Sequence, residues 1–147
     1  MTIVKKTAEA TINRPADEIW AVIGSFTDIA WIPGSEEARA TMDGDLRTVN
    51  RDAWDRIGFS VSQRLTDHSD ERRTYSYVLP EPISFEQMME PGKIAHAIDG
   101  KLTVTPIDET RSHVTWDLET EDFLMSGAFA EYQKALDTLK TRLEVRS

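Results

Sequence analysis

The segment from Met125 to Val145 most strongly limits the fold that this chain can adopt. Its large apolar residues recur at intervals of 4, 3, 4, 3 and 4 positions, and no proline interrupts them. This spacing predicts a long amphipathic helix, for which Ser126 is the expected N-cap. Such a helix must bury its one apolar stripe against another element. The stripe consists of Met125, Phe129, Tyr132, Leu136, Leu139 and Leu143.

Between Glu37 and Leu118 the apolar residues have a period of two instead. Short alternating runs separated by polar turns predict about six strands there, in addition to a strand at residues 3–12. Two of the runs, at residues 59–65 and 73–79, flank a polar turn and indicate a hairpin. Because these strands follow one another without intervening helices, we expect an antiparallel sheet.

Two short helices are expected after the first strand. Pro15 suits the first helical position, and apolar residues then repeat at helical spacing as far as Phe26. Thr27 can begin a second helical turn that ends at Trp31, where Pro33 stops it. We expect Trp31 to close one end of the space between sheet and long helix, either as a gate or as a hydrophobic plug.

These elements predict an α+β fold for residues 1–147, taken as a single domain. A curved antiparallel sheet of six to seven strands wraps around the long C-terminal helix. One long helix and two short ones do not fill the concave side of such a sheet, so a cavity is expected between them. Residues 80–92 contain three prolines, which predicts an excursion from the sheet with an apolar underside.

Composition disfavours several classes of function. The chain has 147 residues, a net charge of −9 and no cysteine. The negative charge disfavours nucleic-acid binding, and the lack of cysteine excludes thiolate catalysis and cysteine-based metal sites. No apolar run has the length of a membrane span and no secretory signal is evident, so we expect a cytoplasmic protein. A monomer or a homodimer is expected.

No metal or cofactor is expected either. The three histidines, His68, His96 and His113, lie in different predicted strands or turns and lack the spacing of zinc ligands. Motifs for phosphate loops, dinucleotides and serine nucleophiles are missing from the sequence.

Candidate ligand-binding residues are those that the predicted alternation turns inward. His96 shares its parity with Ile94 and Ile98, so it could be a polar or acid–base group in the cavity, or a histidine bonded to backbone near a strand end. Arg73 could hold a carboxylate in register with two tyrosines. The aromatic candidates could equally be plain core, and a buried Gln63 needs hydrogen-bond partners. The set is Trp31, Trp54, Gln63, Arg73, Tyr75, Tyr77, His96, Trp116, Phe129 and Tyr132.

Several stretches resemble one protein family. Pro15-Ala16, Ile19-Trp20 and Trp31-Ile32-Pro33-Gly34 match an opening pattern of strand, helix and Trp-x-Pro-Gly, while residues 63–81 and 102–119 resemble a central hairpin and two last strands. The pattern is similar to that of the polyketide cyclase/dehydrase and lipid-transport family, within the START-like (SRPBCC) superfamily of the major birch-pollen allergen. The chain departs from it at Gln63, usually Glu, and in the longer segment 80–92. The resemblance implies a helix-grip fold with a hydrophobic pocket.

Three functions are compatible with this resemblance. The favoured one is a carrier or sensor that binds a small hydrophobic molecule of lipid, polyketide or aromatic type, which predicts an apolar cavity with few polar groups. A cyclase or dehydratase would need an ionisable pair, for example with His96, on the cavity floor. A chaperone-associated interaction module would show an exposed apolar patch and a collapsed pocket.

Overall fold

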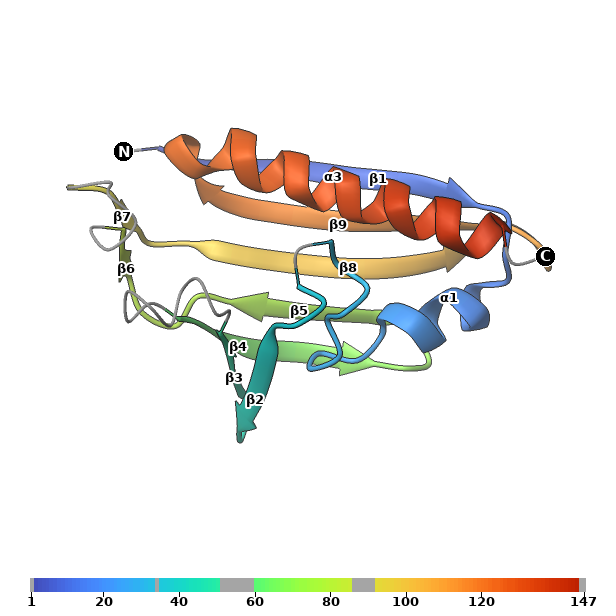
Figure 1. Ribbon diagram of the computed structural model, residues 1–147, viewed down its shortest axis with the longest axis horizontal. Helices are drawn as coiled ribbons and strands as arrows, with labels where there is room; N and C mark the ends of the chain where they lie inside the picture. Colours follow the sequence, from blue (N-terminus) through green and yellow to red (C-terminus); the bar gives the residue numbers. More distant parts are fainter. Residues whose placement is uncertain (1, 34, 51–59, 86–91, 146–147) are drawn as a thin grey trace.

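The computed structural model describes residues 2–33, 35–50, 60–85 and 92–145 (Figure 1). Within them, a seven-stranded antiparallel sheet has the order β1-β9-β8-β5-β4-β3-β2, and β6 pairs with β7 in a separate ribbon. The strands are β1 Ile3–Ile12, β2 Arg39–Asp43, β3 Leu46–Asn50, β4 Val61–Ser69, β5 Thr74–Val78, β6 Ile83–Ser84, β7 Ile94–Ala95, β8 Ile98–Pro106 and β9 Ser112–Glu121. The helices are α1 Ala16–Ile23 and α3 Asp122–Val145.

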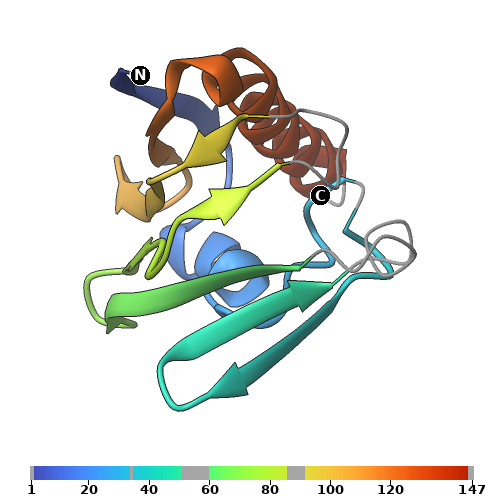
Figure 2. The ribbon, with the colours of Figure 1, turned by 90° about the vertical axis from the view of Figure 1, so that its left-hand side faces the viewer.

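The predicted α+β helix-grip architecture is confirmed. The sheet curves from β1, which lies beside α3, around to β3 and β2 on the far side of the concave space (Figure 2). Along β1 every second residue from Ala8 to Ile12 is buried, and two of these three are alanines. Small side chains on this strand let α3 pack closely across β1 and β9.

One helix, not two, lies between β1 and β2 in the described part of the chain. α1 has acidic residues in its first turn and ends where the Gly24 amide donates to the Trp20 carbonyl, 2.8 Å away. The predicted second helical turn is wrong, because residues 27–33 contain bends and a turn but no helix. The Ser25 hydroxyl accepts the Asp28 amide at 3.2 Å, and the Ile32 amide bonds only three residues back to Ile29.

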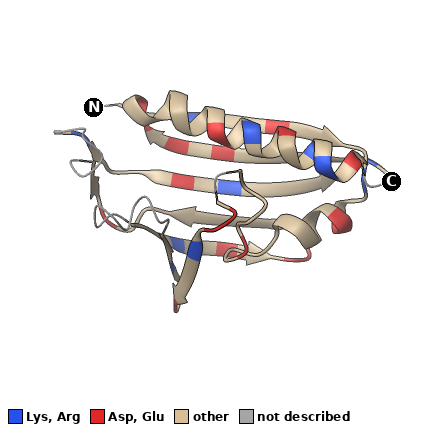
Figure 3. Cartoon of the chain, viewed as in Figure 1, with Lys and Arg blue, Asp and Glu red and all other residues tan. Residues whose placement is uncertain are grey.

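The long C-terminal helix is confirmed, but it begins earlier than Ser126. β9 ends at Glu121 and α3 begins at Asp122, whose amide donates to the Thr2 carbonyl at 2.9 Å. The first turn is therefore tied to the N-terminal strand, and Ser126 lies inside the helix. Acidic and basic residues are both spread along α3 (Figure 3). Among the described residues, no helix has the length and apolar character needed to span a membrane.

The segment after β5 leaves the main sheet, as its prolines predict. β6 and β7 pair antiparallel, with Ile83 opposite Ala95, and form a ribbon at the end of the molecule where α3 begins (Figure 1). The side chain of Phe85 reaches the concave space. This agrees with an excursion that has an apolar underside; residues 86–91, with Met88 and Met89, lie outside the described residues.

Candidate functional site

A cavity of about 240 Å³ lies between the concave face of the sheet and the first half of α3. Its apolar lining comes from the turn after α1, three strands, the β6 segment and α3. These residues are Ile29, Ile32, Val49, Val61, Phe85, Ile98, Leu124 and Ala128. The polar and aromatic lining consists of Arg47, Gln63, Tyr75, Tyr77, Trp116, Thr120, Glu131 and Tyr132. In the described part of the chain, this pocket lies where the sequence predicts a cavity.

An aromatic stack forms one side of the cavity. Tyr132 of α3 lies on Trp116 of β9 with ring centroids 3.8 Å apart and planes 20° apart. Trp31 packs behind Trp116 at 5.4 Å and is itself buried, so it supports the wall without lining the cavity. Trp31 thus holds the indole of Trp116 in place, and Tyr132 stacks on that indole.

Two tyrosine hydroxyls and one indole form a hydrogen-bonded group on the same wall. The Tyr77 hydroxyl oxygen accepts a bond from Trp116 Nε1 at 3.1 Å and lies 2.8 Å from the Tyr132 hydroxyl. Burial raises the pKa of Tyr77, and burial together with the neighbouring Tyr77 raises the pKa of Tyr132 well above its usual value. Both phenols are therefore neutral at physiological pH and can form hydrogen bonds, but the raised pKa values make them weak proton donors.

Gly100 makes room for this group. On β8 it lies opposite Tyr77 of β5, and a Cβ atom at this position would sit 2.4 Å from the Tyr77 hydroxyl oxygen. No side chain fits there without moving the tyrosine ring. The glycine is thus required by close approach and not by backbone conformation.

A buried arginine faces the same space from β3. Arg47 has 7% of its surface exposed, and its Nη2 donates to Gln63 Oε1 at 2.5 Å while Nη1 donates to the Phe26 carbonyl at 2.8 Å. Gln63 is held in turn, since its Nε2 donates to the Ile98 carbonyl at 3.0 Å. The guanidinium also lies over the Phe26 ring, 3.9 Å from the centroid. The need of Gln63 for partners is met by these contacts.

Tyr75 extends the aromatic wall toward α1. It is 1% exposed, and its ring lies 5.5 Å from Phe26 in an edge-on contact and 6.1 Å from Trp20. Burial raises the pKa of its hydroxyl beyond the physiological range, and the nearby Tyr77 adds to the shift. Tyr75 therefore also contributes a neutral phenol.

Five of the ten predicted residues come together around the cavity: Gln63, Tyr75, Tyr77, Trp116 and Tyr132. Trp31 stands behind them, and Trp54 lies outside the described residues. The remaining three, at positions 73, 96 and 129, do not line this cavity.

The expectation that His96 faces inward is wrong. β7 ends at Ala95 and β8 begins at Ile98, so the alternation is interrupted where His96 lies. Its side chain is 55% exposed, while its amide donates to the buried carboxylate of Glu121. Ala95 and Ala97 take the inward positions in its place.

Arg73 was predicted in register with the tyrosines, and this too is wrong. It belongs to the turn before β5, with φ 51°, so the strand alternation does not extend to it. Its Nε makes an ion pair with Asp17 of α1 at 2.7 Å. This contact joins the β4–β5 turn to the first turn of the helix.

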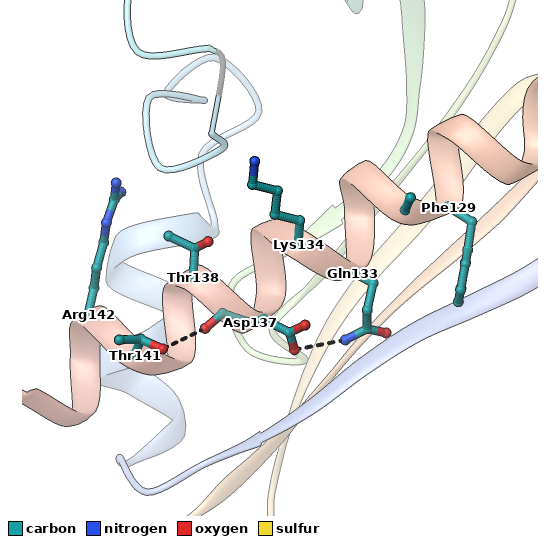
Figure 4. A pocket seen from close by; sticks show the side chains of 8 residues that line it. Phe129, Gln133, Lys134, Asp137, Thr138, Thr141 and Arg142 are labelled. Carbon is teal, nitrogen blue, oxygen red and sulfur yellow. Dashed lines mark hydrogen bonds between the residues drawn. The ribbon is translucent and has the colours of Figure 1, made fainter.

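Phe129 is on α3 but faces away from the cavity. It lines a shallow depression on the outer side of the helix, together with Lys134, Asp137 and Arg142 (Figure 4). Lys6 of β1 places its ammonium group 5.2 Å from the Phe129 ring centroid. Phe129 is nevertheless half-buried and packs against the hydrophobic core, which agrees with the plain-core alternative for this residue.

The sequence did contain a signal for Arg47 that the prediction missed. Arg47 and Val49 share one parity of β3, and both are buried. Arg47 is also the direct cross-strand partner of Gln63, which was predicted to need a partner. The β3–β4 register, which the structure supplies, places this inward arginine opposite the inward amide of Gln63.

Metal ligation finds no support in the described residues, where no three histidine, aspartate or glutamate side chains gather in a metal-binding group. The cavity contains one carboxylate, that of Glu131, at an exposed position of α3. The described cavity lining is thus mainly apolar, with tyrosine hydroxyls as hydrogen-bond donors and Arg47 as its one cation.

Comparison with known structures supports the same fold. A Nitrosospira multiformis protein matches with TM-score 0.75 at 17% identity, over 98% of this chain and 100% of the other. The Zhui aromatase/cyclase from Streptomyces sp. R1128 matches with TM-score 0.66 at 17% identity, covering 99% and 96%. Norcoclaurine synthase from Thalictrum flavum, in complex with dopamine and hydroxybenzaldehyde, matches with TM-score 0.62 at 17% identity, covering 99% and 90%. Identities this low establish a shared fold only.

Among curated proteins, no relative matches the sequence. A family description does match, however, and it covers nearly the whole chain. Polyketide cyclase / dehydrase and lipid transport is matched over residues 4–144. The resemblance noted at residues 15–34, 63–81 and 102–119 is thereby confirmed, and the chain belongs to the polyketide cyclase/dehydrase and lipid-transport family.

Proposed function

We propose that this protein binds a small hydrophobic molecule in the cavity between sheet and α3, as a carrier or sensor. The observation that carries the proposal is the cavity itself, about 240 Å³ with eight apolar side chains in its lining. Since an apolar cavity of about 150 Å³ is enough to bind benzene, this one suits a body of roughly one or two rings. A long polyketide chain would need more space than the described cavity offers.

The ionisable groups favour binding over acid–base catalysis. His96, one candidate for an acid–base group, is outside the cavity, and the three tyrosines have pKa values that are raised by burial. Glu131 is exposed on α3 and makes no ion pair among the described residues. A general base held by a second ionisable group is thus not found on the described cavity wall.

A cyclase-type reaction is the second candidate. Tyr77 and Tyr132 have hydroxyls 2.8 Å apart on the cavity wall, and neutral phenols could donate to a ligand carbonyl. This candidate predicts turnover of a bound polyketide-like substrate that falls in the Tyr77→Phe variant. Unchanged turnover in that variant would remove the role of the pair.

The binding proposal is tested by filling the cavity. Ala128 lines it from α3, whereas Ala130 lies on the outer side of the same helix. Native mass spectrometry of freshly purified protein should reveal a co-purified small molecule. Calorimetric titration with neutral 2-naphthylmethanol should show binding that Ala128→Phe weakens by about tenfold or more, equal to about 1.4 kcal/mol.

Ala130→Phe is the matched control, because it adds the same ring outside the cavity. Its affinity for 2-naphthylmethanol should equal that of the unmodified protein, and thermal unfolding should show both variants folded. Equal binding by Ala128→Phe and Ala130→Phe, or no bound molecule in either experiment, would overturn the proposal.

A further inference from the structure

Arg47 is a buried cation that has no acidic partner among the residues that the structure describes. It is 7% exposed, and both of its hydrogen-bond acceptors, Gln63 Oε1 and the Phe26 carbonyl, are neutral. Within the described residues, none of the ion pairs includes Arg47. A buried charge is normally paired, because removing an ion from water is energetically costly.

The guanidinium is also incompletely bonded. An arginine offers five N–H donors, and those with partners here are one on Nη1 and one on Nη2. Nε is buried without any partner. The contacts with Phe26 at 3.9 Å and Tyr77 at 5.4 Å offset part of the desolvation cost, but they do not neutralise the charge.

The arginine is nevertheless held in one position at the cavity wall. Gln63 turns its oxygen toward Arg47 because its amide nitrogen is bound to the Ile98 carbonyl. All three residues belong to or adjoin the cavity lining. A fixed cation with spare donors beside an apolar space is the arrangement that recognises an anionic oxygen on an otherwise hydrophobic molecule.

We propose that the ligand of this cavity carries an anionic oxygen, as a carboxylate, enolate or phenolate, which pairs with Arg47 while its ring system lies against Trp116 and Tyr132. The proposal rests on the proposed function and adds the chemical class of the ligand. Glu131, the carboxylate of the lining, belongs to α3 and not to the sheet wall that holds Arg47. The anionic end is therefore directed to β3 and away from the helix.

The net charge of the chain makes the proposal easier to test. At −9 the overall field repels anions. A preference for an anionic ligand over a neutral one of equal shape must therefore come from a local positive group. Within the described lining, Arg47 is the one cation.

The experiment compares three probes of one shape by calorimetric titration at pH 7. They are 2-naphthoate, 2-naphthylmethanol and 2-naphthylmethylammonium, which are anionic, neutral and cationic. We expect 2-naphthoate to bind at least about tenfold more tightly than the neutral probe, and the ammonium probe to bind most weakly. In Arg47→Met the preference for 2-naphthoate should fall to about threefold or less, while Arg47→Lys should retain part of it.

Arg64→Met is the matched control. Arg64 is on β4, next to Gln63, but its side chain is 47% exposed and paired with Asp45. Its loss should leave the preference unchanged. If Arg47→Met fails to fold, the affinities of the three probes for the unmodified protein and for Arg47→Lys still test the proposal.

The outcomes separate the two proposals. Binding of the neutral probe without a preference for 2-naphthoate would overturn the anionic ligand and leave the cavity function intact. A preference that survives in Arg47→Met would also overturn it and would assign Arg47 to holding the Phe26 carbonyl. Absence of binding for all three probes would overturn both proposals.

Discussion

The two halves of α3 have different surroundings, although one apolar stripe runs through both. In the C-terminal half, Leu136, Leu139 and Leu143 are buried in the same cluster as β1 and α1. In the N-terminal half, Leu124 and Ala128 are only half-buried and face the cavity. α1 lies beside the C-terminal half and fills the concave space there (Figure 1).

The difference shows which part of the concave side is close-packed and which part contains the pocket. α1 ends at Ile23 and is followed by bends and turns, so among the described residues no helix covers the other half of the concave side. The sheet there carries Arg47, Gln63 and the tyrosines together with aliphatic residues such as Val49 and Val61. One half of the helix thus stabilises the fold, while the other is free to accept a ligand.

Truncation of one leucine at each end should separate these roles most clearly. Leu136→Ala removes a side chain that is 0% exposed and leaves a cavity in close-packed surroundings. We expect the free energy of unfolding to fall by about 3 kcal/mol, measured by urea titration. Leu124→Ala, in the open half, should cost less than half as much. Equal losses would mean that the two halves are packed alike.

A second comparison substitutes one glycine whose surroundings are crowded and one that has open space around it. Gly100→Ala forces a methyl group against Tyr77, so we expect a loss of about 2 kcal/mol from overpacking. Gly127→Ala in α3 has open space around the new Cβ atom and should gain about 0.5–1 kcal/mol through helix propensity. Urea titrations measure both effects.

The cause of the first effect can be isolated with a double variant. Combined with Tyr77→Ala, Gly100→Ala should lose most of its penalty, because the ring that it meets is gone. An undiminished penalty in the double variant would place the strain in the backbone of β8.

The smallest expected effect concerns two aspartates near opposite ends of β8. Bonds from the Thr110 amide and from Arg111 lower the pKa of Asp108 to about 2. Its contribution is therefore complete above its unfolded value of 3.8 and is lost as pH falls toward 2. Asp108→Asn should be less stable than the unmodified protein above pH 4, by a difference that closes in acid. Thermal unfolding between about pH 2 and pH 6 measures this.

Asp99, beside the cavity residue Ile98, should behave in the opposite way. Partial burial raises its pKa, so its contribution is present below the unfolded value and is lost as pH rises through the folded value. Asp99→Asn should thus gain stability relative to the unmodified protein as pH rises. The same sign for both variants would contradict the assignment.

Most of the architecture was predictable because it depends on local periodicity. The helical spacing of apolar residues in α3 and the β-branched residues of β1 each favour one element locally. The tertiary structure contains both elements. The failures fall where regular alternation stops. His96 lies in the break between β7 and β8, and Arg73 belongs to a turn, so neither points where a continuous strand would have placed it.

The candidate site was predictable only in part, for a related reason. Parity identifies inward residues such as Gln63, Tyr75 and Tyr77, but it does not say which inward residues border a space and which are close-packed. Arg47 was missed because its environment depends on the register that sets it opposite Gln63. Its burial and its neutral hydrogen-bond partners come from contacts between segments that are far apart in the sequence.

The sequence by itself determined the α+β class, the antiparallel sheet, the long helix and the prospect of a cavity, because hydrophobic period and turn residues act locally. Only the tertiary structure decided that α1 fills one half of the concave side and leaves the other open. It also decided that a lone arginine faces that opening. These features depend on strand register and on packing between segments far apart in the chain, which no local pattern encodes.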